Sequence, residues 1–427
     1  MPLTIPEFLR AALARPVAVF GAGVSGQGVQ ALLRQLGAEG VVYDRDGTPF
    51  TKECASRHGL VAFSPGFAPN HPWLLAACTA GLECLGEVDF AACCWRGRVV
   101  AVTGTNGKTS LTEFLTLALT CAGETAHAVG NIGLPFSQLA AETAGGGADD
   151  IAVCEISSFQ AETLQHLRAE ATLWTNFAED HLERHPGMEA YFSAKWNLVV
   201  RTAAEGLHVG SSVCRAARAL NRHLPATVCV TTEGLPPDPQ LLGTAFADYP
   251  QRENFVLAAA WWQASGREPA GLYAAAHEYQ PGRHRLARVG ERDGVVFWND
   301  SKATNFHAVE AALGRFDRPV HWLAGGRGKG GDVAAFVPRI APRIAHAWLI
   351  GETAPQLAAA CRTHGVPCTS CAGLEEAVRG AAAAARSGDH VVLSPGFASF
   401  DLFRNYQARG DRFEQLVEEL GVATNFR

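Results

Sequence analysis

The sequence predicts an α/β protein made of three units. Short apolar strands alternate with helical segments along the whole chain, which is typical of parallel sheets covered by helices. Each of three strands leads directly into a glycine-rich turn, and the length of 427 residues fits two or three domains. We therefore expect one domain over residues 1–95, a second over 96–282 and a third over 283–427.

The first unit begins with an apolar strand at Pro16–Phe20, and the turn Gly21–Gly26 follows with the pattern GxGxxG. A helix to about residue 36 and a strand ending at Asp44 come next. This order is typical of a dinucleotide site, with the acid on a ribose, but another nucleotide or a plain tight turn also fits it. The later segment Phe63–Gly66 follows the next predicted element and could close over a diphosphate.

The second unit has a strand at Val99–Val102, the loop Gly104–Thr109 and a helix at Leu111–Cys121. Glycines let backbone N–H groups converge on phosphate oxygens, and the helix start adds positive potential. Lys108 would neutralise the β- and γ-phosphates of ATP, and the hydroxyl of the next threonine would bind Mg²⁺. The loop is a short variant, because the standard spacing would need a glycine where Val102 stands.

Polar residues follow two further strands of this unit, predicted at 151–155 and 171–175. Glu155 ends the first, and a loop rich in acids and histidines, which includes His181, follows the second. Ligands of α/β proteins bind at such strand ends. Both side chains could face a magnesium ion, and a solvated polar loop is the alternative.

The third unit has polar, turn-rich loops after its strands, which we predict at 295–298, 320–324, 347–350 and 390–393. The loops Asn299–Asn305 and Ala324–Asp332 combine lysine with hydroxyl groups, and Leu393–Asp401 follows the last of these strands. Lysine and hydroxyl groups suit the binding of a small molecule that carries a carboxylate.

Composition narrows the possible classes. The chain is 48% hydrophobic and 18% charged, with a net charge of −6 and no block of Lys or Arg, which argues against nucleic acid as a partner. The start lacks the apolar run of a signal peptide, and no stretch would span a membrane. We expect a cytoplasmic monomer whose twelve cysteines are reduced thiols in apolar surroundings.

Five segments together resemble the Mur ligases of peptidoglycan synthesis: GTNGKT, EISSFQ, NFAEDHLERH, NDSKATN and LSPGFASFDLFRNYQARG. The likeness spans nearly the whole chain and is greatest to the members that add D-glutamate to UDP-N-acetylmuramoyl-L-alanine. It implies a Rossmann-like UDP-binding domain, a central P-loop ATPase-type domain and a Rossmann-like amino-acid-binding domain. It also implies ATP and Mg²⁺, and an acyl-phosphate intermediate.

The resemblance assigns roles to individual residues. The catalytic ones are Lys108, Glu155, His181 and Lys195. Those that hold the UDP-sugar are Gly23, Val24, Ser25, Asp44, Ser64, Pro65, Gly66 and Asn131. Those that hold ATP are Gly104, Thr105, Asn106, Gly107, Lys108, Thr109, Ser110, Asn254, Arg285, Asp300 and Lys302. Those for glutamate are Thr304, Lys329, Ser399, Phe400 and Tyr406. The magnesium ligands are Thr109, Glu155, His181 and Lys195, the last as a carbamate.

The sequence departs from the family pattern at several positions, and other functions remain as alternatives. Gln251 stands where the family has an asparagine, and Phe400 and Tyr406 replace a more usual leucine and phenylalanine. A related ligase that adds L-glutamate is one alternative. A folylpolyglutamate-type ligase would leave the first unit without a role. An NAD-dependent oxidoreductase would leave the phosphate loop unexplained, and a P-loop binding protein without covalent chemistry would leave the loops of the third unit unexplained.

Overall fold

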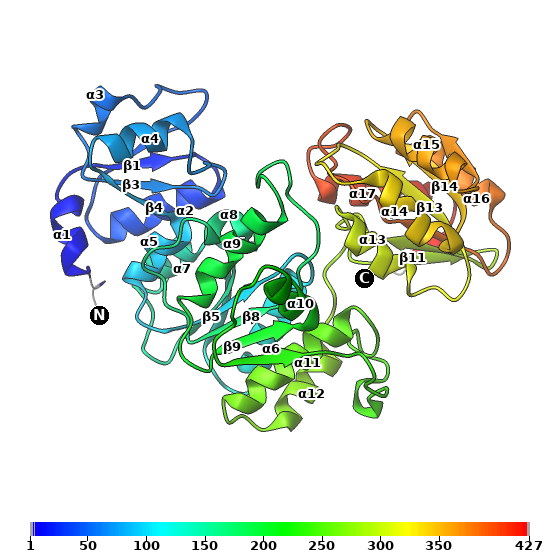
Figure 1. Cartoon of the computed structure of the whole chain (residues 1–427), viewed down its shortest axis with the longest axis horizontal. Coiled ribbons are helices and arrows are strands. Elements are labelled where there is room, and N and C mark those ends of the chain that lie inside the picture. The colour runs from blue at the N-terminus through cyan, green and yellow to red at the C-terminus, as the bar shows by residue number, and fades with distance from the viewer. Residues whose placement is uncertain (1–2, 4, 425–427) are drawn as a thin grey trace. The chain divides into compact units, whose positions relative to one another are not determined.

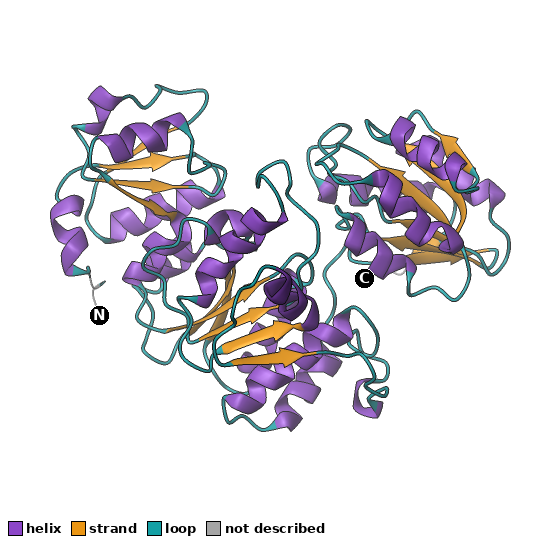
Figure 2. Cartoon of the chain, viewed as in Figure 1, coloured by secondary structure: helices purple, strands orange, loops and turns teal. Residues whose placement is uncertain are grey.

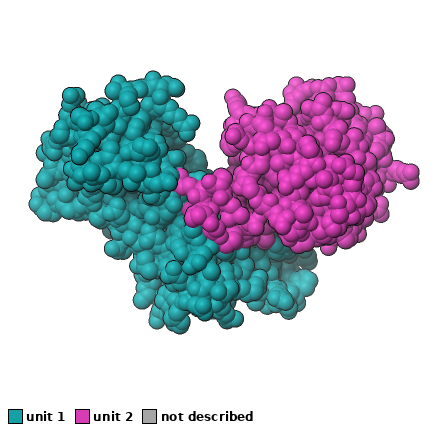
Figure 3. All heavy atoms as spheres, turned by 45° about the horizontal axis from the view of Figure 1, so that its top comes forward, with its two compact units in different colours: residues 1–177, 189–279 teal, residues 178–188, 280–427 magenta. Residues whose placement is uncertain are grey.

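The computed structural model describes residue 3 and residues 5–424, and in this range the strands form three separate sheets with helices packed on them (Figures 1 and 2). The predicted α/β class with three sheets is confirmed. The sheets fall inside the three predicted residue ranges, and the function assigned to each range stays a prediction. The chain divides into two compact units, each with most of its residue contacts inside itself, and Figure 3 shows the units in different colours. Unit 1 combines residues up to 177 with 189–279, and unit 2 combines 178–188 with the residues from 280 onward.

The first sheet is parallel, with strand order β2-β1-β3-β4. One face packs on α1, α2 and α5 and the other on α3 and α4. Its elements are α1 Glu7–Leu13, β1 Val17–Phe20, α2 Val24–Gln35, β2 Gly40–Tyr43, α3 Lys52–Ala55, β3 Leu60–Phe63, α4 Pro72–Thr79, β4 Glu83–Gly86 and α5 Glu87–Cys94.

The second sheet is also parallel, in the order β10-β9-β8-β5-β7-β6. Helices α6, α11 and α12 cover one face, while α5, α7 and α8 pack on the other. Its elements are β5 Arg98–Thr103, α6 Lys108–Cys121, β6 Ala126–Gly130, α7 Phe136–Glu142, β7 Ile151–Glu155, α8 Ser158–Ala161, β8 Ala171–Trp174, α9 Met188–Val199, β9 Leu207–Gly210, α10 Ser211–Ala219, β10 Thr227–Val230, the 3₁₀ turn Pro239–Leu241, α11 Gln251–Ala264 and α12 Pro269–Glu278.

The third sheet has the order β15-β14-β13-β16-β12-β11-β17, in which β11 pairs antiparallel with both neighbours. Helices α13, α14 and α15 line one core, and α16 and α17 line the other. Its elements are β11 Ala287–Arg292, β12 Val295–Asn299, α13 Phe306–Leu313, β13 Val320–Gly325, α14 Val333–Ile340, the 3₁₀ turn Ala341–Arg343, β14 Ile344–Ile350, α15 Ala354–Thr363, β15 Cys368–Ser370, α16 Leu374–Ala384, β16 His390–Leu393, α17 Tyr406–Glu419 and β17 Ala423–Thr424.

The strands predicted from sequence all lie on observed strands, and most of them are largely buried, whereas β2 is mostly exposed or half-buried. Strands β1, β5, β7, β8 and β13 are buried almost along their whole length, as expected when helices cover both faces of a parallel sheet. Strand β5 lies between β7 and β8. Their carboxyl ends therefore meet at one edge, which is where α/β proteins place their ligands.

One expectation is wrong: Cys214 and Cys229 form a disulfide, so not every cysteine is a free thiol. Helix α10 connects β9 to its parallel neighbour β10, and it packs back over them with Cys214 in its buried face. This places Cys214 beside Cys229 of the edge strand. Over the described part of the chain, no helix has the length and apolar character to cross a membrane.

Candidate active site

The phosphate loop joins the end of β5 to the start of α6, and its conformation requires glycine at two positions. Gly104 has φ 146° and Gly107 has φ 83°. A Cβ atom on Gly104 would lie 1.9 Å from Oγ1 of Thr175, and one on Gly107 would lie 2.7 Å from Oδ1 of Asn254. The loop is thus in close contact with the end of β8 on one side and with α11 on the other.

The two residues after β8 fix the loop by hydrogen bonds. The backbone N–H of Asn106 donates to Oδ1 of Asn176 (2.9 Å), while Nδ2 of Asn176 and Oγ1 of Thr175 donate to the carbonyl oxygen of Asn106 (3.1 and 2.6 Å). Sequence reasoning missed this role. The signal was a threonine–asparagine pair at the end of a buried strand.

Two lysine amines donate to the same backbone oxygen. Nζ of Lys108 lies 2.9 Å from the carbonyl oxygen of Gly104 and 2.8 Å from that of Thr105. Nζ of Lys195, on α9, also lies 2.9 Å from the Gly104 oxygen and 3.2 Å from Oγ1 of Thr103. The loop therefore concentrates positive charge where phosphate oxygens would lie.

Lys195 is buried, with 1% of its surface exposed, although its helix position by itself suggests a surface residue. Its Nζ also lies 5.1 Å from the ring centroid of Tyr191, whose hydroxyl is 3.2 Å from Oγ1 of Thr105. A buried amine needs strong local partners to offset its lost hydration. The structure thus joins Lys195 to the phosphate loop, while its role as a carbamylated metal ligand stays a prediction.

Glu155 ends β7 beside the loop strand, and its carboxylate is 2% exposed. Its Oε1 accepts from Nδ2 of Asn131 at 2.9 Å, whereas its Oε2 has no hydrogen-bond partner among the described residues. A buried carboxylate oxygen without a partner carries a large desolvation penalty. A hard cation such as Mg²⁺ would compensate it, so the donor set fits a magnesium ion.

The start of α11 lies against the phosphate loop. Nδ2 of Asn254 is 2.8 Å from Oε1 of Gln251 and 3.4 Å from the carbonyl oxygen of Gly107. Nε2 of Gln251 is 3.5 Å from Oγ of Ser110 on α6. The structure therefore brings Asn254, Gln251 and Ser110 together, and Gln251 takes part in the contact although the family motif has an asparagine there.

In the first sheet, Asp44 holds the GxGxxG turn. Its carboxylate accepts from the backbone N–H groups of Ala22 (2.5 Å) and Arg45 (2.6 Å), and the bond from Ala22 contributes most to a pKa below the usual range. Oγ of Ser64 is buried without a partner among the described residues, and it faces Gly21, where a Cβ would lie 2.7 Å from it. The turn and the Ser64–Gly66 loop thus adjoin, while Val24 is exposed.

In the third sheet, Asp300 stabilises the turn that carries Arg285. Its Oδ1 accepts from the N–H of Leu286 (3.0 Å) and its Oδ2 from Oγ of Ser394 (2.9 Å). Burial raises the pKa of Asp300 to about 7, although both hydrogen bonds and the nearby Arg285 act in the opposite direction. The buried carboxylate thus fixes the turn next to Arg285, whose role in binding ATP stays a prediction.

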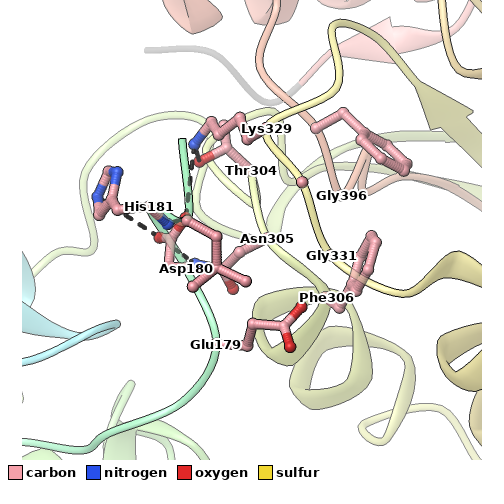
Figure 4. A pocket seen from close by; sticks show the side chains of 12 residues that line it. Glu179, Asp180, His181, Thr304, Asn305, Phe306, Lys329, Gly331 and Gly396 are labelled. Carbon is pink, nitrogen blue, oxygen red and sulfur yellow. Dashed lines mark hydrogen bonds and ion pairs between the residues drawn. The ribbon is translucent and has the colours of Figure 1, made fainter. Parts of the chain in front are cut away.

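A hollow of about 310 Å³, partly open to solvent, lies within unit 2 (Figure 4). Lys329 reaches into it, with Nζ 3.4 Å from Oγ1 of Thr304 and 3.7 Å from Oδ1 of Asp180. Asn305 donates to the other oxygen of Asp180 at 2.9 Å, so Asp180 bridges the two residues (Figure 4). The structure brings together Thr304 and Lys329, both predicted to bind glutamate, while sequence reasoning missed Asp180 and Asn305.

The other residues predicted to bind glutamate do not line this hollow. Ser399 is buried, Phe400 is 64% exposed, and Tyr406 begins α17 with its ring centroid 4.1 Å from Nζ of Lys302. His181 lines the hollow, and its ring lies near the carboxylates of Asp180 and Glu183. The roles predicted for these side chains stay predictions.

The arrangement suits transfer of a phosphoryl group to a carboxylate. Unit 1 supplies a glycine loop with two lysine amines and a buried carboxylate that fits Mg²⁺, which are the parts that orient and neutralise a triphosphate. Unit 2 supplies a lysine and a threonine that line its hollow, and these can bind a small carboxylate.

Matches to known proteins agree with this chemistry. Residues 102–235 match the Mur ligase middle domain, and residues 284–397 match the Mur ligase glutamate ligase domain. The UDP-N-acetylmuramoylalanine–D-glutamate ligase of Nocardia farcinica is 35% identical over 97% of this chain and 98% of the relative. The enzyme of that name from Frankia casuarinae is 38% identical over 96% and 90%, and the one from Aquifex aeolicus is 30% identical over 94% and 98%.

Solved structures share the fold. A pseudomurein peptide ligase type C from Methanothermus fervidus aligns with a TM-score of 0.62 at 14% identity, over 95% of this chain and 100% of its own. The MurF ligase from Thermotoga maritima in complex with ADP aligns with a TM-score of 0.57 at 15% identity, over 84% and 96%. At these identities the likeness shows the fold alone.

We expect Gly104→Ala to weaken ATP binding by about tenfold or more, because its Cβ would overlap the Thr175 hydroxyl in a left-handed backbone conformation. Gly123→Ala is the matched control, since Gly123 also has positive φ, follows the same helix and has open space around its Cβ position. Calorimetric titration with ATP measures both variants. Equal affinities would show that the loop does not depend on Gly104.

We expect Asp300→Asn to flatten the dependence of stability on pH. The carboxyl titrates near 3.8 in the unfolded chain and at about 7 in the folded one, so the folded protein holds an extra proton between these values. The free energy of unfolding should therefore fall as pH rises through this window, by about 1.4 kcal/mol per pH unit.

Urea unfolding at several pH values between 4 and 8 measures this dependence, and the asparagine can keep both hydrogen bonds. Asp293→Asn, which alters an exposed acid, serves as the control. The assignment is wrong if wild type and Asp300→Asn lose stability in parallel as pH rises.

Proposed function

The chain belongs to the Mur ligase family, and we propose that it joins D-glutamate to UDP-N-acetylmuramoyl-L-alanine while ATP is converted to ADP and phosphate. The proposal rests mainly on the phosphate loop. There the amines of Lys108 and Lys195 both donate to the carbonyl oxygen of Gly104, beside the buried Glu155. Relatives that carry this enzyme name match over nearly their whole length. A free carboxylate is a poor electrophile at neutral pH, which is why such a ligase must first activate it.

The first step forms an acyl phosphate. A carboxylate oxygen of the UDP-sugar attacks the γ-phosphorus of ATP, the bond to the β-γ bridging oxygen breaks, and ADP leaves. Lys108 neutralises charge on the phosphates from its place over the loop carbonyls. In the second step the glutamate amine attacks the acyl carbon, and phosphate departs with the former carboxylate oxygen.

The metal would be held by oxygen ligands around the end of β7. Oε2 of Glu155 and the hydroxyl of Thr109 are the proposed ligands. The first is buried without a protein partner in the described chain, and the second stands in the first turn of α6, where the phosphate loop ends. When bound, Mg²⁺ would screen the phosphate charges. The roles of His181 and of carbamylated Lys195 as metal ligands stay predictions.

Binding of the two other reactants is proposed at separate places. In the first sheet, the turn held by Asp44 and the adjoining Ser64 would take the UDP group through backbone N–H groups and hydroxyls. In unit 2, Lys329 and Thr304 would take a carboxylate of glutamate, with Asp180 and Asn305 fixing the lysine and the threonine loop.

We expect phosphate release from ATP only when UDP-N-acetylmuramoyl-L-alanine is present with an amino acid. D-Glutamate should exceed L-glutamate and other amino acids by about tenfold or more. A site that holds a carboxylate and the side chain while directing the amine to the acyl carbon contacts three groups around the α-carbon, and so distinguishes enantiomers. A coupled phosphate assay measures each combination. A preference for L-glutamate would correct the amino acid, and no release with any amino acid would overturn the proposal.

We expect Lys195→Ala to lose activity and to regain part of it when a short-chain carboxylic acid such as acetate is added. A carbamate would turn one of two neighbouring cations into an oxygen ligand, and an added carboxylate can occupy the space left by the truncated side chain. Lys108→Ala is the control, because a carboxylate cannot replace its positive charge. Equal rescue of both variants, or of neither, would count against the carbamate.

A further inference from the structure

Helix α5 carries two buried carboxylates whose partners lie in another part of the fold. Glu87 and Asp89 stand in its first turn and are 2% and 0% exposed. The helix follows β4 of the first sheet, yet its buried side packs partly on the core of the second sheet. Burying two acids is unfavourable unless hydrogen bonds compensate them, so their partners matter.

Asp89 accepts from three consecutive backbone N–H groups in the segment between α8 and β8. Its Oδ2 lies 2.9 Å from the N–H nitrogen of Gln165, and its Oδ1 lies 3.0 and 2.7 Å from those of His166 and Leu167. Both oxygens accept from donors in one continuous stretch of backbone. Such charge-assisted bonds are shorter and stronger than neutral ones.

Glu87 makes the second link, to the start of α7. Its Oε1 accepts from both the N–H and the Oγ of Ser137, each at 2.7 Å. Burial raises the pKa of Glu87, and the two bonds from Ser137 act against this. Gly28 of α2 lies on the same serine, since a Cβ there would be 2.6 Å from its Oγ.

The partner segments follow two predicted site residues along the chain. Helix α7 starts five residues after Asn131, and Gln165 stands ten residues after Glu155, beyond the short helix α8. Pro65, of the loop proposed to hold the UDP group, lines a hollow together with both carboxylates of α5. The hydrogen bonds of Glu87 and Asp89 thus join the part of unit 1 proposed to bind UDP to the part proposed to bind ATP and the metal.

We infer that Glu87 and Asp89 are positioning residues that fix the UDP-binding turn relative to the phosphate loop, so that a substrate reaching from one to the other presents its carboxylate to ATP. The inference rests on the proposed function, because it needs a substrate that spans both places. It makes a specific distinction between ligands. UDP or ADP would contact only one of the two places, so its affinity should not depend on Glu87 and Asp89. UDP-N-acetylmuramoyl-L-alanine would contact both places, so its affinity should depend on them.

The test is calorimetric binding of these three ligands to the full chain. In Asp89→Asn, the amide N–H₂ must face a backbone N–H whichever way the side chain turns, so at least one of the hydrogen bonds to Asp89 is lost. Glu87→Ala removes the oxygen that accepts from Ser137. We expect UDP and ADP to bind within about twofold of wild type and the spanning substrate to bind about tenfold or more weakly. Glu87→Gln keeps an acceptor oxygen and should recover most of the affinity that Glu87→Ala loses.

Glu124→Gln is the matched control for loss of stability. Glu124 accepts from Arg98 and Arg267, and neither arginine is a partner of Glu87 or Asp89, so this variant loosens the second sheet without removing their hydrogen bonds. If Asp89→Asn is not recovered folded, Glu87→Ala with its glutamine rescue decides. Equal weakening of all three ligands, or an unchanged spanning substrate, overturns the inference and leaves the proposed function standing. A wild-type protein that does not bind the spanning substrate overturns both.

Discussion

The carbonyl oxygen of Gly104 is the point on which the site depends. It accepts from both Lys108 and Lys195, and it can face them only because Gly104 adopts a left-handed conformation that Thr175 would deny to any side chain. Gly104 follows strand β5, which lies between β7 and β8. Glu155 at the end of β7 and the Thr175–Asn176 pair after β8 therefore lie at the same edge of the sheet as Gly104. The chemistry proposed for the ligase thus follows from strand order and one backbone conformation.

The proposed binding sites lie in different compact units of the molecule. Unit 1 holds the turn proposed for UDP and the phosphate loop, and the α5 carboxylates join their sheets through backbone N–H groups and Ser137. Unit 2 holds the hollow with Lys329 and Thr304. This division suits a two-step ligation in which unit 1 would form the activated carboxylate and unit 2 would bind the amino acid.

The sequence predicted what local pattern encodes. Buried strands read as apolar runs, and the glycine loop with Lys108 has a shape that few other functions need. The short edge strands β10 and β15 were missed because their side chains are partly exposed and give little apolar signal. Strands β3 and β9 were missed although they are largely buried and lie inside their sheets. Contacts between distant residues were also missed. Asp89 looks like any acid in a first helical turn, and Lys195 like a surface lysine, until the fold shows what surrounds them.

The central claim is that ATP activates the carboxylate of the UDP-sugar at the phosphate loop. Its most direct test uses UDP-N-acetylmuramoyl-L-alanine labelled with ¹⁸O in the carboxylate, incubated with ATP, Mg²⁺ and D-glutamate. An acyl phosphate predicts that one labelled oxygen moves from the carboxylate to the released phosphate, as mass spectrometry of the phosphate would show. Phosphate released without the label, while the amide product forms, would contradict the account.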